Sequence, residues 1–306
     1  SSTASDGSNW RTLSMMDSAT RQDLRRLLVA PGPLVVPFAY DAFSARLIER
    51  AGFSAVGISG SAVAASLLGV PDVGLMSREE VVGQARRIAA AISLPVIADA
   101  DTGYGGPLQA ARTVQDLEAA GVAGLFMEDQ QDPKRCGHLA GTEVISTDAM
   151  IGKLTAALES RTDPNFVIIA RTDAIESEGL EAAALRARAY LDAGADAMFV
   201  AAIGSREDLE LLPGLIDRDA PLMVVLTEGG RTPLIPANDL ATIGYKIVGF
   251  SGLAIGVAAK AVERGLGILK AHGTTESVLK DTMGLADRND VLDLKRYQDL
   301  EGRTAR

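Results

Sequence analysis

The sequence has a single cysteine, only two histidines and few aromatic residues (4%). One cysteine cannot form a disulfide within the chain, which fits a reducing compartment, so we expect a cytoplasmic protein. The two histidines, His138 and His272, lie far apart in the sequence and exclude a site with several histidine ligands from one chain. No stretch approaches ~20 uninterrupted apolar residues, so no membrane span is predicted. The net charge of −10 argues against nucleic acid or an anionic membrane as a partner.

The chain is long for one domain of most folds, but its 306 residues are ordinary for an α/β barrel. With 47% hydrophobic residues it can build a large core. Residues 1–19 are rich in Ser and Thr and lack an apolar signal core, so we expect a flexible N-terminal tail and no targeting peptide. Residues 20–306 are expected to form a single barrel domain with a C-terminal helical extension.

Short apolar runs bounded by Gly, Pro and polar residues predict eight buried strands. The predicted strands are residues 34–40, 55–58, 94–98, 124–127, 166–170, 197–202, 222–226 and 247–250. Predicted helices cover residues 21–28, 41–52, 77–92, 107–120, 180–193, 206–216 and 253–269, and a further helix ends near residue 161. No Gly-rich dinucleotide fingerprint follows the first strand, so the pattern favours a (β/α)₈ TIM-type barrel over an open doubly wound sheet.

Asp99 and Asp101 follow the third predicted strand, and their i, i+2 spacing turns both carboxylates the same way. Such a pair repels unless a cation joins it, and hard oxygen ligands suit Mg²⁺, with Mn²⁺ as the other possibility. The alternative is a capping pair for the helix that starts near Pro107. Polar residues after several strands would meet at one face of a barrel, which favours the metal site. These residues are Asp41, Ser59, Asp99, Asp101, Glu128, Arg171 and Glu228.

The polar loop 130–142 contains the only cysteine, Cys136, next to Lys134, Arg135 and His138. Positive neighbours favour the thiolate, so we expect Cys136 to be partly ionised and able to act as an acid, a base or a nucleophile. The alternative is an exposed cysteine without a role. A polar loop with glycines after a barrel strand is also typical of a lid that closes over a ligand.

The motifs DADTGYGG, MEDQ with KRCGH, and ARTDA together resemble the isocitrate lyase / phosphoenolpyruvate mutase superfamily over residues 20–300. The segments VVPFAYDAFSA, KRCGHLAG and TEGGRTP are most similar to the branch of carboxyphosphonoenolpyruvate phosphonomutase and methylisocitrate/dimethylmalate lyase. The resemblance implies a Mg²⁺-dependent lyase that cleaves a carbon–carbon bond of a small 2-hydroxy or 2-oxo dicarboxylic acid through a metal-bound enolate. A phosphonomutase that forms a phosphorus–carbon bond is the alternative.

The resemblance also implies roles for individual residues. Asp99 would bind Mg²⁺ directly, while Asp72, Asp101 and Glu128 would hold its water ligands. Cys136 would protonate the enolate, Arg171 would pair with a substrate oxygen, and Lys134 and His138 would complete the catalytic set. The substrate-binding set would comprise Tyr40, Asp41, Ser59, Gly60, Ser61, Asp99, Gly137, Arg171, Thr227 and Glu228.

Two positions depart from the lyase pattern. Lyases of the superfamily carry Glu where this chain has Ala201, and Asn where it has Val225. An inactive or purely binding relative is therefore a third possibility. Family members are tetramers that exchange their last helix, and the predicted helix 253–269 is apolar over much of its surface. We therefore expect a homotetramer with a swapped C-terminal helix.

Overall fold

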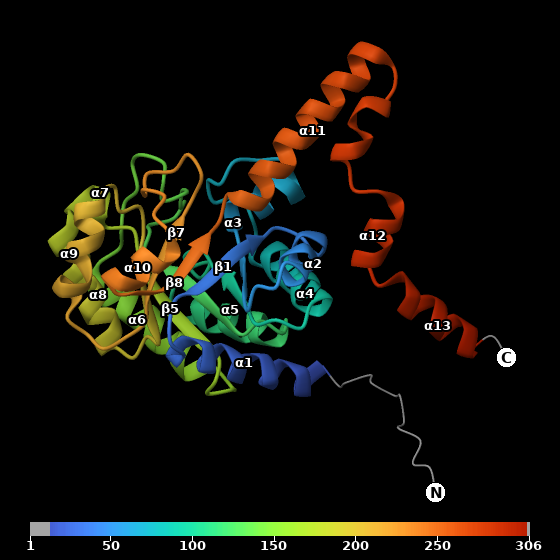
Figure 1. Cartoon of the computed structure of the whole chain (residues 1–306). Helices are drawn as coiled ribbons and strands as arrows, with labels where there is room; N and C mark the ends of the chain where they lie inside the picture. Colours follow the sequence, from blue (N-terminus) through green and yellow to red (C-terminus); the bar gives the residue numbers. More distant parts are fainter. Residues whose placement is uncertain (1–12, 305–306) are drawn as a thin grey trace, which may run out of the picture.

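The predicted barrel is confirmed by the computed structural model, which describes residues 13–304 (Figure 1). Eight parallel strands pair in sequence order, and β8 closes the barrel on β1. The strands are β1 (Leu34–Ala39), β2 (Val56–Ile58), β3 (Val96–Asp99), β4 (Gly124–Glu128), β5 (Val167–Thr172), β6 (Ala197–Val200), β7 (Leu222–Leu226) and β8 (Tyr245–Phe250).

Helices surround the barrel, and most begin and end close to the predicted residues. Around the strands lie α1 (Leu13–Val29), α2 (Ala42–Arg50), α3 (Gly60–Val63), α4 (Arg78–Ala91), α5 (Pro107–Ala119), α6 (Thr147–Ser160), α7 (Ile175–Glu178), α8 (Leu180–Asp192), α9 (Arg206–Ile216) and α10 (Ala237–Ile243). The C-terminal extension contains α11 (Leu253–His272), the 3₁₀-helix η2 (Glu276–Asp281), α12 (Leu285–Val291) and α13 (Leu294–Thr304). A π-helix, η1 (Ala64–Leu68), continues α3.

The segment 1–19 was predicted to be a flexible tail, but helix α1 begins inside it, at Leu13. Residues 1–12 lie outside the described part of the chain. The figure shows α1 across the end of the barrel opposite the loops that follow the strands (Figure 1). Leu24 and Leu28 of α1 join the buried cluster inside the barrel, so this helix closes the barrel floor.

Alternation along the strands decides which side chains enter the barrel. Val167 and Ile169 of β5 face the interior, and Arg171, two residues after Ile169, lies on the same side of the strand. In the same way, Ile97 of β3 is followed by Asp99. Inward apolar residues therefore form the barrel core, and the inward residue at each strand end forms its mouth.

Helix α11 leaves the barrel and projects away from it (Figure 1). None of its residues is buried, and Val257, Val262 and Leu266 are about 60% exposed (62%, 59% and 61%). The exchange of this helix between subunits and the tetramer stay predictions. No helix within residues 13–304 has the length and apolar character needed to cross a membrane.

Candidate active site

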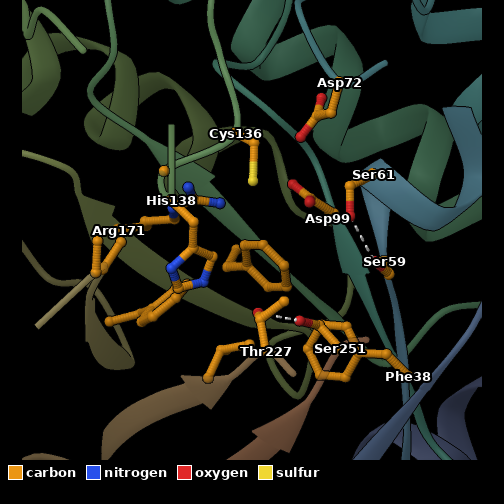
Figure 2. A pocket seen from close by; sticks show the side chains of 16 residues that line it. Phe38, Ser59, Ser61, Asp72, Asp99, Cys136, His138, Arg171, Thr227 and Ser251 are labelled. Carbon is orange, nitrogen blue, oxygen red and sulfur yellow. Dashed lines mark hydrogen bonds between the residues drawn. The ribbon is translucent and has the colours of Figure 1, made fainter. Parts of the chain in front are cut away.

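A cavity of about 60 Å³ opens at the mouth of the barrel, where the strand ends meet (Figure 2). A volume of this size holds only a few water-sized groups, so the cavity in this arrangement suits a small molecule. It is lined by Phe38, Ser59, Ser61, Asp72, Asp99, Phe126, Cys136, Gly137, His138, Arg171, Phe199, Ala201, Ala202, Val225, Thr227 and Ser251.

The segment after β2 brings backbone and hydroxyl groups to the cavity. Ser59 caps α3 through its Oγ, which accepts from Ala62 N at 3.3 Å and lies 3.2 Å from Ser61 Oγ. The Gly60 N–H donates to Asp99 Oδ2 at 3.2 Å. A Cβ on residue 60 would lie 2.7 Å from that oxygen, so only glycine lets the backbone come this close to Asp99. The predicted contact of this segment with the substrate stays a prediction.

Four carboxylates and one lysine are packed together beside the cavity. The Lys134 ammonium is 2.7 Å from Asp72 Oδ1 and 2.6 Å from Asp101 Oδ1. The lysine is only 3% exposed, although it lies in a loop. Asp99 and Glu128 are also buried. We call Asp72, Asp99, Asp101 and Glu128 the carboxylate cluster; they are the four residues predicted to hold the metal.

Burial makes this cluster electrostatically unusual. Burial and the neighbouring Asp101 raise the pKa of Asp99 to about 6. Burial also raises the pKa of Glu128 well above its ordinary value, although Arg171 and Lys134 oppose the shift. The pKa of Lys134 is raised too, because the surrounding carboxylates outweigh the opposing effect of burial. Without a further cation nearby, Asp99 and Glu128 therefore favour the protonated form more than an ordinary carboxyl group does.

The residues fit a divalent cation that keeps most of its water ligands. Glu128 Oε1 is buried and has no hydrogen-bond partner, which is costly unless water or a cation reaches it. Within residues 13–304, no three His, Cys, Asp or Glu side chains converge closely enough to bind an ion directly. Direct binding by Asp99 and water-mediated contacts of Asp72, Asp101 and Glu128 stay predictions; Mg²⁺ commonly keeps several of its waters in protein sites.

Arg171 lies at the end of β5, and carboxylates occupy most of its donors. Its Nε and Nη2 donate to the two Asp173 oxygens, both at 2.8 Å, and Nη1 is 2.8 Å from Glu128 Oε2. The guanidinium also lies over the Phe199 and Phe126 rings, 5.2 and 6.0 Å from their centroids. Arg171 is thus a fixed, largely neutralised cation on the cavity wall.

The loop 130–142 lies over the cavity, as expected for a lid. Cys136 N donates to Asp72 O at 3.0 Å, and Figure 2 shows the thiol pointing into the cavity between Asp99 and His138. The expected partial ionisation of Cys136 is wrong: burial raises the pKa of its thiol, and Asp72 adds to the shift. Lys134 is engaged by the carboxylate cluster and Arg135 is exposed, so neither cation favours the thiolate enough. Opening of the lid without ligand stays a prediction.

Gly137 and His138 attach the lid to the rest of the site. A Cβ on residue 137 would lie 2.4 Å from Asp173 Oδ1, so a glycine is needed for the lid to rest on the Arg171–Asp173 pair. His138 Nδ1 accepts from Arg231 N at 3.2 Å, and burial together with Arg171 lowers the pKa of the imidazole. The histidine on the cavity wall is therefore neutral.

Three predicted substrate contacts lie off the cavity wall. Asp41 caps α2 by accepting from Ser44 N at 2.7 Å, which is the structural role that its sequence position also indicated. Tyr40 precedes it, and Glu228 is exposed after β7 beside Gly252. Thr227 does line the cavity, and its hydroxyl is 2.6 Å from Ser251 Oγ. Substrate contacts of Tyr40, Asp41 and Glu228 stay predictions.

Several residues of the site were not predicted from the sequence. Phe38, Phe126 and Phe199 form its base, and Asp173 fixes Arg171. The phenylalanines could have been found from their positions in β1, β4 and β6. Every second residue of a strand points into the barrel, and this inward series continues from the core to the mouth. Ser251, at the end of β8, could have been found by the same reasoning as the other strand ends.

Comparison with known proteins gives consistent matches over most of the chain. Residues 24–269 match the phosphoenolpyruvate phosphomutase family. The chain is 47% identical to "Probable 2-methylisocitrate lyase 1" of Corynebacterium glutamicum over 91% of this chain and 90% of that protein. It is 40% identical to 2,3-dimethylmalate lyase of Eubacterium barkeri, covering 92% of this chain and 97% of that protein.

Solved structures give the same picture. Oxaloacetate acetylhydrolase with the inhibitor 3,3-difluorooxalacetate superposes with a TM-score of 0.89 at 33% identity, over 94% of this chain and 98% of the other. Phosphonopyruvate hydrolase in complex with oxalate and Mg²⁺ has a TM-score of 0.85 at 29% identity, over 94% of this chain and 99% of the other. The resemblance carried by the sequence motifs is confirmed.

Proposed function

Because the chain belongs to the phosphoenolpyruvate phosphomutase family, we propose that it is a Mg²⁺-dependent lyase that cleaves a carbon–carbon bond of a small 2-hydroxy or 2-oxo dicarboxylic acid. The observation that carries the proposal is the Cys136 thiol, which faces the cavity from the lid, beside Asp72 and Asp99, two of the carboxylates that would hold the cation. A lyase of this kind needs both a proton donor and a cation within reach of its substrate.

The carboxylate cluster would hold the cation, with Asp99 as its direct ligand and Asp72, Asp101 and Glu128 around its waters. When bound, Mg²⁺ would supply positive charge for the oxygen atoms of the acid and for the negative charge that develops on cleavage. The backbone N–H groups of residues 59–61 would position a carboxylate of the substrate.

Cleavage of a 2-hydroxy acid requires two proton movements. The hydroxyl proton leaves toward the carboxylates on the cavity wall, and the O–H electron pair forms the new carbonyl as the carbon–carbon bond breaks. The electron pair of that bond remains on the leaving carbon, which the Cys136 thiol then protonates. The lid excludes water, so the proton comes from Cys136 and not from solvent.

The alternatives have weaker support. A transferred phosphoryl group would require free cationic donors. Arg171 and Lys134 are both already paired with carboxylates, and His138 is neutral. Ala201 and Val225 change the wall of the cavity but leave the carboxylate cluster and Cys136 in place, which argues against an inactive relative.

The test is the substitution Cys136→Ser. In a lyase, a serine hydroxyl is a much weaker acid, so cleavage of a dicarboxylic acid such as 2,3-dimethylmalate should slow roughly 10²- to 10⁴-fold. Calorimetry should show unchanged affinity for oxalate in the presence of Mg²⁺. Leu139→Ala, in the same lid but outside the cavity wall, serves as the control and should stay near the wild-type rate.

The outcomes separate the possible functions. Cleavage at a near wild-type rate in Cys136→Ser would contradict the proton-donor assignment. Conversion of phosphoenolpyruvate to a phosphonate, followed by ³¹P NMR and insensitive to Cys136→Ser, would establish the phosphonomutase instead. No turnover of any of these compounds by the wild type would support a binding role.

A further inference from the structure

Each oxygen of the Asp101 carboxylate has one side-chain partner. Lys134, in the lid, lies 2.6 Å from Oδ1, and the Tyr104 hydroxyl donates to Oδ2 at 2.8 Å. The backbone of Asp101 is held as well, because its N–H donates to Asp99 Oδ1 at 3.0 Å and its carbonyl accepts from Glu128 N at 2.9 Å. The backbone therefore places Asp101 next to Asp99 and Glu128, and Lys134 and Tyr104 set the direction of its carboxylate.

Tyr104 reaches Asp101 because the turn after β3 adopts an uncommon backbone conformation. Asp101 and Tyr104 have φ of +46° and +63°, and Gly103 between them has φ of +81°. A residue with a side chain rarely takes such a value unless other contacts enforce it. Here the Tyr104 ring packs against the core, and the Gly103 carbonyl accepts from Thr113 Oγ1 of α5 at 3.1 Å. Neither of these contacts involves the lid.

The two side-chain partners of Asp101 therefore depend on the lid in different ways. Lys134 belongs to the lid, so the predicted opening of the lid would withdraw its ammonium from Oδ1. Tyr104 lies three residues from Asp101 in the same turn and would stay in place. Among the contacts of the described residues, the Tyr104 hydroxyl is then the side-chain donor that still holds the Asp101 carboxylate.

We propose that Tyr104 is a positioning residue of the cation site, whose hydroxyl keeps Asp101 oriented for Mg²⁺ while the lid is open. The inference rests on the proposed function for the cation site and goes beyond it, since Tyr104 neither lines the cavity nor belongs to the carboxylate cluster. Loss of a partner that orients a metal-binding group commonly weakens metal binding roughly 10- to 100-fold. We expect Tyr104→Phe to bind Mg²⁺ about tenfold more weakly than the wild type, at the lower end of this range, because Asp101 is predicted to contact the cation through water.

Calorimetric titration of the metal-free protein with Mg²⁺, without any acid present, measures this effect directly. Tyr104→Phe removes one oxygen atom and keeps the ring. Tyr245→Phe is the matched control, because the Tyr245 hydroxyl also makes a buried hydrogen bond, to Leu209 O at 3.1 Å, and Tyr245 begins β8 at the end opposite the mouth. Urea unfolding should show a small loss of stability for both variants, but only Tyr104→Phe should lose Mg²⁺ affinity.

A double-mutant cycle with Lys134→Met tests the part played by the lid. When Lys134 is present, Asp101 keeps one side-chain partner after Tyr104→Phe, whereas without Lys134 it keeps neither. Tyr104→Phe should therefore weaken Mg²⁺ binding roughly threefold more in the Lys134→Met background than in the wild type. Equal effects in the two backgrounds would overturn the link to the lid. If Lys134→Met does not fold without metal, the comparison of Tyr104→Phe with Tyr245→Phe still decides the role of Tyr104.

The outcomes separate this inference from the proposed function. Equal Mg²⁺ affinity of Tyr104→Phe and the wild type would overturn the inference and leave the proposed function standing. An equal loss of affinity in Tyr245→Phe would also overturn it, because the effect would then be one of general stability. A wild type that does not bind Mg²⁺ would overturn the proposed cation site and this inference together. If Mg²⁺ binding depends on Tyr104 but no acid is cleaved, the proposed function fails and the role of Tyr104 stands.

Discussion

The buried ion pairs of Lys134 give the sharpest energetic prediction. Its ammonium lies 2.6–2.7 Å from two carboxylates and is 3% exposed, so Lys134→Met removes the cation and leaves buried negative charges without it. Removing one partner of a buried pair typically costs about 3–5 kcal/mol. We therefore expect the free energy of unfolding to fall by about this amount in EDTA, a large share of the stability of an ordinary domain.

A divalent cation should reverse part of this loss. Mg²⁺ bound to the carboxylate cluster supplies the missing positive charge, and binding to the folded state alone stabilises it by mass action. Urea unfolding at a fixed protein concentration, with EDTA or with Mg²⁺, measures both effects. The stabilisation by Mg²⁺ should be larger for Lys134→Met than for the wild type.

The control variant removes a positive charge from the surface instead of from the buried cluster. Arg206 pairs with Glu210 at 2.8 Å on α9, with both side chains at least half exposed (60% and 50%), and Arg206→Met should change stability little. A Lys134→Met variant that is as stable as the wild type in EDTA would refute the reasoning. So would a variant whose stability does not respond to Mg²⁺.

Three further predictions concern the lid, the metal and the assembly. Gly137→Ala places a Cβ against Asp173 Oδ1, so the lid should no longer pack against the Arg171–Asp173 pair. We expect kcat/KM to fall on the order of 10²-fold and the melting temperature to stay near that of the wild type. A wild-type kcat/KM would show that the lid accommodates the methyl group. Asp99→Ala, or EDTA added to the wild type, should abolish activity and Mg²⁺-dependent stabilisation, whereas full activity in EDTA would exclude the metal. Light scattering at micromolar concentration should show that the wild type is a tetramer. Leu266→Glu should weaken the tetramer, because Leu266 is an apolar side chain that is 61% exposed on α11 in the single chain. A wild-type monomer would contradict this prediction.

The barrel could be predicted because its signals are local and repeated. Each strand is a short apolar run between turn residues, and Asp41, Ser77 and the Gly at helix ends mark where helices begin and end. The helices that were missed carry end signals too, since Ser59 caps α3 and Gly69 and Gly244 follow η1 and α10, but they are too short to show a helical period. Helix α3 and η1 are built from small and apolar residues without amphipathic spacing, and α10 spans only seven residues.

Only the site residues that lie at the inward-facing ends of strands could be predicted from the sequence. Asp99, Glu128 and Arg171 continue the inward side of their strands, so their convergence follows from the closed barrel. The contact between Lys134 and Asp72 joins two loops 62 residues apart, and neither loop has a periodic pattern. The ionisation of Cys136 was mistaken for the same reason, since charges close in sequence were taken as close in space.

Charge balance connects the cation, the lid and the substrate. Five buried or half-buried carboxylates of the site face two paired cations; they are Asp72, Asp99, Asp101, Glu128 and Asp173, with Lys134 and Arg171 as the cations. Where these carboxylates are ionised, their surplus of negative charge would attract a divalent cation and repel an anionic acid. With the proposed cation bound, part of the surplus would be neutralised and the acid would enter more favourably. Because Lys134 belongs to the lid and also to this balance, the predicted closure of the lid would add positive charge to the site as it excludes water. Both effects would favour the negative charge that develops in the proposed cleavage of a carbon–carbon bond.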